Sequence, residues 1–198
     1  MATKSPTRAP TFGEPPDGIV REAADATDPS TARSLVDRIA SEVGVPGILV
    51  NTIGAFHLGD TLSTTPEDLQ LMVDVNLGTA LWLSQAVAPH MQRGGSGAIV
   101  HVSARPGIDP TAGMAAYSLS KAALAHLTRI LDVELRPHGI RVNAVVPQLM
   151  DTVANRASFP PDLIAHAVAP EAIADVIAFL VSDAAAPVSG AILPAYGA

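Results

Sequence analysis

The chain has 198 residues, 48% of them hydrophobic, so one domain with a sizeable core is expected. A net charge of −7 without any basic run argues against nucleic acid or an anionic membrane surface as partner. There is no cysteine, which excludes disulfides and thiolate catalysis and fits a reducing, cytoplasmic setting, and the six scattered histidines predict no metal site.

Residues 1–17 contain four prolines and no apolar run. They are expected to be a disordered arm rather than a signal or an anchor, followed by one domain at 18–198. No later segment has the roughly 20 uninterrupted apolar residues of a membrane span.

From residue 18 onward, short β-type runs alternate with helical ones. The expected strands are 19–24, 47–51, 97–104, 140–147 and 190–195. The expected helices are 28–43, 66–91, 113–136 and 170–183. This alternation predicts an α/β fold, a doubly wound parallel sheet with helices on both faces and right-handed crossovers.

In such a sheet the ligand lies beyond the carboxyl ends of the strands. Three loops at this edge should converge on one crevice, and they carry Asn51, Ser103, Arg105 and Gln148. Tyr117 and Lys121 should reach the same crevice from the following helix, because side chains four residues apart lie on one face.

Tyr117 and Lys121 are notable because the chain has only two tyrosines and two lysines. A compact ammonium beside a phenol can lower the pKa of that phenol toward working pH. The alternative is a solvated helix residue next to a half-buried aromatic ring.

Several motifs resemble the short-chain dehydrogenase/reductase family from about residue 25 to the C-terminus. They are ILVNTIG, DVNLG, GAIVHVSARPG, YSLSKAAL, LRPHGIRVNAVVP and PEAIADVIAFLVSD. The resemblance implies that Tyr117 is the general acid/base, that Lys121 tunes it and holds the cofactor ribose, and that Asn76 completes a proton relay. The family serine falls at Ala104, with Ser103 one residue early as a candidate substitute.

A second departure concerns the cofactor. The glycine-rich strand–turn–helix that carries the dinucleotide in the family needs about 30 residues, more than the 17 before Gly18. An N-terminally truncated, Rossmann-like sheet of about five strands is therefore expected, with strand 19–24 pairing directly with 48–51. The vestigial cofactor-binding candidates are Asn51, Gly54, Asp25 and Pro147.

Three functional hypotheses remain open. The first is cofactor-independent acid/base chemistry (dehydration, isomerisation or cyclisation) on a small carbonyl-containing metabolite, with His101, Arg105 and Gln148 in the pocket. The second is an NAD(P)-dependent carbonyl reductase or alcohol dehydrogenase. The third is a non-catalytic partner or regulatory subunit.

The blander alternatives are a core role for His101, a solvated Arg105, and an Asn76 that satisfies backbone groups at a helix irregularity. The family resemblance implies a homodimer or higher oligomer through helices 66–91 and 113–136.

Overall fold

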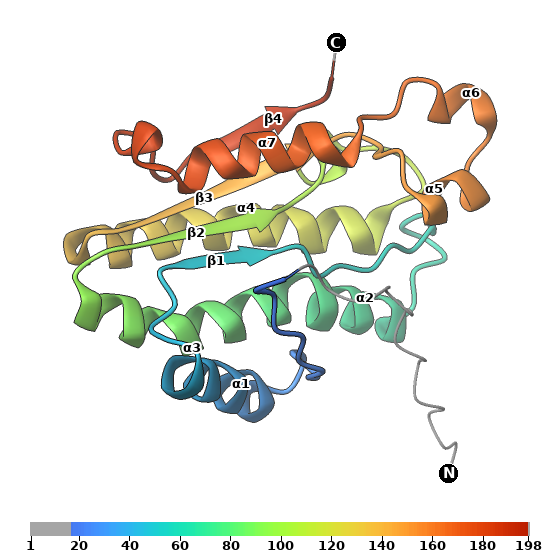
Figure 1. Ribbon diagram of the computed structural model, residues 1–198. Helices are drawn as coiled ribbons and strands as arrows, with labels where there is room; N and C mark the ends of the chain where they lie inside the picture. The colour runs from blue at the N-terminus through green and yellow to red at the C-terminus, as the bar shows by residue number, and fades with distance from the viewer. Residues whose placement is uncertain (1–16, 198) are drawn as a thin grey trace.

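Four parallel strands in the order β1-β2-β3-β4 form the sheet of the computed structural model, which describes residues 17–197 (Figure 1). The strands are β1 (Ile48–Asn51), β2 (Gly97–Val102), β3 (Ile140–Pro147) and β4 (Ile192–Ala195). The α/β class is confirmed, although the described residues hold four strands rather than about five. The expected arm at 1–17 lies outside the described residues except for Asp17.

Helices cover both faces of the sheet, as predicted. The longer helices are α1 (Pro29–Glu42), α2 (Pro66–Val73), α3 (Thr79–Gly94), α4 (Ala115–Leu135) and α7 (Pro170–Val181). The short helices are α5 (Val153–Ser158) and α6 (Pro161–Ile164), with single turns at Asp74–Gly78, Arg105–Gly107, Arg136–His138 and Asp183–Ala185. α3 and α4 pack on one face, α1 packs outside α3, and α7 packs on the other face (Figure 1).

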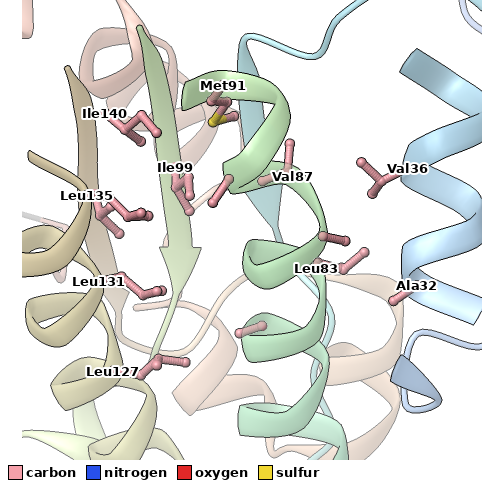
Figure 2. Close-up of a cluster of buried hydrophobic side chains, with 14 of the residues drawn as sticks. Ala32, Val36, Leu83, Val87, Met91, Ile99, Leu127, Leu131, Leu135 and Ile140 are labelled. Atoms are coloured by element: carbon pink, nitrogen blue, oxygen red, sulfur yellow. The ribbon is translucent and has the colours of Figure 1, made fainter. Parts of the chain in front are cut away.

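Adjacent residues of β2 point into two separate cores. Ile99 joins the larger cluster beneath α3 and α4, where it packs with residues such as Val87 and Leu131 (Figure 2). Val100 joins the cluster under α7, with Ile173 and Leu180. A strand buried on both faces reads as a continuous apolar run, which is why this segment was predictable from composition.

The crossover from β3 to β4 has the opposite handedness to the crossovers from β1 to β2 and from β2 to β3. Strand order advances in one direction, yet α3 and α4 lie on one face and α7 lies on the other. At least one crossover is therefore not right-handed, contrary to the prediction. The long β3–β4 connection, which includes α5 and α6, gives the chain the length to reach the second face.

The predicted strand at 19–24 is wrong. Instead of pairing with β1, this segment runs along α1, where Glu22 forms an ion pair of 2.8 Å with Arg38. Asp25 then turns the chain by accepting hydrogen bonds from the backbone and hydroxyl of Thr27. One edge of β1 consequently has no neighbouring strand among residues 17–197.

One continuous helix runs from Pro66 to Gly94. Thr65 begins it with a reciprocal capping box to Asp68, and a π-helical turn at Asp74–Gly78 joins α2 to α3. Its length and apolar composition would also suit a membrane span. Here α3 packs against α1, β1 and β2, which is the setting of a core helix.

Candidate active site

A cavity of about 850 Å³ lies beyond the carboxyl ends of β1, β2 and β3. The loops after these three strands line it, together with the first turns of α4 and the segment that forms α5 and α6. Two backbone hydrogen bonds position the start of α4, because Gly59 N donates to Gly113 O and Ala115 N donates to Gly59 O, both at 2.9 Å. The predicted convergence of loops at this edge is therefore observed.

Tyr117 stands on the wall of this cavity, one turn into α4. Its ring meets Phe56 edge-on, with 5.0 Å between ring centroids and an interplanar angle of 80°, and Phe56 in turn lies 5.8 Å from Phe159. Burial raises the pKa of Tyr117 to about 12, so its hydroxyl stays protonated at neutral pH. This residue can give a proton to a bound ligand.

Lys121 lies one turn further along α4 and is 5% exposed. Its Nζ donates to the carbonyl of Val102 at 2.9 Å, which fixes the ammonium at the end of β2. Burial lowers the pKa of Lys121 to about 8. The loop after β1 passes close by, because a β-carbon on Gly54 would stand 3.2 Å from Lys121 Nζ and 3.0 Å from Asn76 Oδ1.

Asn76 occupies the π-helical turn and is fully buried. Its side chain accepts from Ala55 N at 2.8 Å and donates to Ala55 O and to Ser120 Oγ at 3.0 and 2.9 Å. These bonds fix the loop after β1 against α4. The structure thus places Asn76 in the backbone-satisfying role, and its part in a proton relay stays a prediction.

Ser103 borders the cavity, but its hydroxyl is already engaged. It is 2% exposed and donates to the backbone carbonyl of Lys121 at 2.9 Å. Ala104, the residue at the family serine position, also borders the cavity and brings no donor there. Ser103 therefore does not offer a free hydroxyl to a ligand in this arrangement.

His101 does not reach the cavity, so its predicted place in the substrate pocket is wrong. It points under α3 and α4, where its ring nitrogens contact Ser84 Oγ at 3.1 Å and Thr128 Oγ1 at 3.0 Å. Burial, and secondarily the charge of Lys121, lowers the pKa of His101 to about 4. The core alternative is confirmed.

Arg105 and Gln148 both line the cavity, as predicted. Arg105 Nη1 donates to Gln148 Oε1 at 2.8 Å, and Arg105 Nε lies 3.4 Å from Asp109 Oδ2. The guanidinium carbon also lies 4.8 Å from the centroid of the Tyr196 ring. Three partners thus hold Arg105 in place, although its side chain is 45% exposed.

Of the four vestigial cofactor-binding candidates, two line the cavity and two do not. Gly54 and Pro147 line the cavity, whereas Asp25 lies in the turn before α1, outside the lining. Asn51 is 2% exposed at the end of β1, and its Nδ2 is a buried donor without a hydrogen-bond partner in the described chain.

Sequence reasoning missed the outer wall of the cavity. That wall comprises Phe56, Phe159, Met150, Leu163 and His166 among others. The chain has only four phenylalanines. One of them, Phe56, contacts the Tyr117 ring, and another, Phe159, contacts Phe56. Scarcity of aromatic residues is the one signal that could have drawn attention to them.

Comparison with known proteins gives matches over most of the chain. Residues 11–197 match the family described as enoyl-(acyl carrier protein) reductase. A 4-formylbenzenesulfonate dehydrogenase of Comamonas testosteroni is 32% identical over 189 residues, covering 88% of this chain and 75% of that protein. A cis-4-hydroxycyclohexanecarboxylate dehydrogenase of Sinomonas cyclohexanicum is 39% identical over 184 residues, covering 87% and 73%.

Among solved structures, a 7α-hydroxysteroid dehydrogenase complexed with NADH and 7-oxo glycochenodeoxycholic acid has a TM-score of 0.81 and 30% identity. The match covers 87% of this chain and 71% of that one. Since these relatives are dehydrogenases and one is solved with NADH, the prediction of cofactor-independent chemistry is wrong, and the oxidoreductase alternative is favoured.

The Tyr117–Lys121 pair and the loops around it point to one family. The matches in sequence and in fold point to the same family. This chain belongs to the short-chain dehydrogenase/reductase family.

Proposed function

We propose that this protein is an NAD(P)-dependent oxidoreductase that interconverts a hydroxyl and a carbonyl group on a small ring-bearing molecule. The observation that carries the proposal is the Tyr117–Lys121 pair on the wall of the 850 Å³ cavity. The relatives support the substrate class, because their names specify a formyl or hydroxyl group on a six-membered ring that also bears an acid group.

The described residues fit the nicotinamide-riboside half of such a cofactor. Lys121 offers an ammonium for the ribose hydroxyls, and Gly54 leaves room beside that ammonium, since a β-carbon there would stand only 3.2 Å from Nζ. At the end of the neighbouring strand, Asn51 Oδ1 accepts from Ile53 N at 3.2 Å, while its Nδ2 is a buried donor without a partner in the described chain. The cofactor would supply or accept a hydride, which carries two electrons.

The fit is weaker for the pyrophosphate. Across residues 17–197, no glycine-rich turn leads from a strand into a helix. The α1 N-terminus is closed to phosphate, because the Asp28 carboxylate already accepts from Ser30 N and Thr31 N. We therefore assign the described residues to the nicotinamide side alone.

In carbonyl reduction, Tyr117 donates the proton that the carbonyl oxygen needs as it becomes a hydroxyl, and in oxidation it takes that proton back. At pH 7, below the Lys121 pKa of about 8, the Lys121 ammonium is mostly charged. Phe56 and Phe159 give the cavity an apolar wall beside the Tyr117 ring.

The test begins with calorimetric titration by NADPH and NADH, followed by assays with 4-formylbenzenesulfonate and cis-4-hydroxycyclohexanecarboxylate as probes. Tyr117→Phe should bind the nucleotide normally but lower kcat by at least about 10²-fold, the usual contribution of general acid catalysis. This variant keeps the ring contact with Phe56, so its unfolding midpoint should match the wild type. A folded wild type that binds neither nucleotide would contradict the proposal.

A further inference from the structure

Carbonyl reduction in the cavity calls for a hydrogen-bond donor to the substrate oxygen. The family serine that would supply this donor is replaced by Ala104. Oxidoreduction of a carbonyl is assisted by a donor aimed at the oxygen on which negative charge develops. Ala104 provides none, and the Ser103 hydroxyl is committed to the carbonyl of Lys121 at 2.9 Å. Tyr117 alone would then face that oxygen.

Gln148 lies beside this gap. The β2–β3 register pairs Val102 with Val145, and Ser103 N continues the ladder by donating to Val145 O at 2.9 Å. Extending this register by two residues places Ala104 level with Pro147, so that Gln148 follows immediately. Ala104, Pro147 and Gln148 all line the cavity.

The orientation of the Gln148 amide follows from its partner. A guanidinium can only donate, so the amide must present Oε1 to Arg105 Nη1, which lies 2.8 Å away. The Nε2 group is then turned away from Arg105, and its two N–H donors have no partner among residues 17–197. Free donors on a residue that lines the cavity are available to a ligand.

Arg105 is itself immobilised, by Asp109 at 3.4 Å and by the ring of Tyr196 at 4.8 Å. A cationic donor on Oε1 draws electron density from the amide, which strengthens the opposite N–H groups as donors. Arg105 thereby both aims and polarises the Gln148 side chain.

We propose that the Gln148 amide donates to the substrate carbonyl oxygen in place of the absent serine hydroxyl, with Arg105 as its positioning residue. This inference rests on the proposed function. With a nicotinamide bound to supply the hydride, the C=O π pair would move onto oxygen, that oxygen would take the proton of Tyr117, and Gln148 Nε2 would stabilise the developing charge.

The test uses Gln148→Met, which keeps the side-chain length and removes the donors. Gln92→Met is the matched control, because Gln92 is exposed on α3, away from the cavity lining. The probe is 4-(dimethylamino)cinnamaldehyde, whose absorption moves to longer wavelength when its carbonyl oxygen accepts a hydrogen bond. This shift is read without any cofactor, and kcat for its reduction is read with NADPH or NADH.

Gln148→Met should reduce the spectral shift to the part that the Tyr117 hydroxyl alone produces, and should lower kcat by about 10²–10³-fold, the usual effect of losing one such donor. Gln92→Met should change neither. Ala104→Ser should restore both in the Gln148→Met background, and should have a smaller effect in the wild type. Arg105→Met alone should reduce both the spectral shift and kcat. In the Gln148→Met background it should have little further effect, because Arg105 acts through Gln148.

Each outcome decides the matter. A Gln148→Met variant with an unchanged shift overturns the inference, and so does a wild type that shows no shift at saturating probe. A shift that depends on Gln148, in a protein that reduces nothing with either nucleotide, would uphold the donor role of Gln148 and defeat the proposed function.

Discussion

The imidazole of His101 lies in the core between two hydroxyl groups. Thr128 Oγ1 donates to Leu124 O at 3.0 Å, so it is free to accept from His101 Nδ1. Nε2 is then the acceptor for Ser84 Oγ. Burial, and secondarily the charge of Lys121, lowers the pKa of this ring to about 4, so the neutral form prevails at neutral pH.

Stability should therefore depend on His101 in mildly acidic solution. Its pKa is about 4 in the folded state and 6.5 in the unfolded chain, so only the unfolded chain binds the proton between these values. The stabilisation that neutral His101 provides is present above about pH 6.5 and decreases as the pH is lowered. About 2 kcal/mol of the free energy of unfolding is lost near pH 5. Urea titrations near pH 7.5 and pH 5 measure this loss.

His101→Gln should show a smaller loss between the two pH values, while the exposed His138→Gln should behave as the wild type. Equal losses in all three proteins would show that other groups cause the acid sensitivity.

At the scale of elements, the turn Arg105–Gly107 positions α4 against the end of β2. A β-carbon on Gly107 would lie 2.7 Å from the carbonyl carbon of Lys121 and 2.8 Å from Ala122 N. These are backbone atoms of α4, which cannot move aside as a flexible side chain would. The close approach of turn and helix thus requires glycine.

Gly107→Ala should lower the free energy of unfolding by about 1–3 kcal/mol, as expected for an overpacked contact. Gly94→Ala is the control, since no atom lies within 4 Å of its added carbon and it ends a helix, where alanine is as stable as glycine or more so. Denaturant midpoints of both variants test the difference. Equal midpoints would mean that α4 shifts at no cost.

Most elements were predictable from sequence because their patterns are local. The Pro29–Glu42 helix carries its own cap at Asp28, and the central strands are short runs rich in valine and isoleucine. The segment 19–24 failed because a strand also needs a neighbour, and a pattern of β-type residues does not reveal whether an edge is within reach.

The site was predictable to the extent that helix spacing fixes it. Tyr117 and Lys121 reach the cavity together because i and i+4 side chains share a face of α4. The strand residues were harder, since successive side chains alternate between faces. Sequence did not show that His101 points into the core or that the hydroxyl of Ser103 is already used.

At the scale of the whole molecule, the outer face of α4 carries three exposed apolar side chains. Leu119, Ile130 and Val133 are 60%, 43% and 73% exposed, at helical spacing along one stripe. We propose that two copies pair through this stripe and the neighbouring long helix, Pro66–Gly94.

Val133→Glu should convert the dimer to a monomer, because pairing would bury the new charge. Val153→Glu is the control, since Val153 is 85% exposed on α5, away from the stripe. Size-exclusion chromatography with light scattering gives the mass of each variant. A monomeric wild type would contradict the proposal.

The sheet order also has a consequence for synthesis on the ribosome. Since β1, β2, β3 and β4 neighbour one another in the order of the sequence, each strand can add to the edge formed by the previous one as the chain emerges. The layer of α3 and α4 is complete once β3 has been made. α5, α6 and the Gln148 loop follow β3, so a nascent chain builds its main core before it has a site that can bind a substrate.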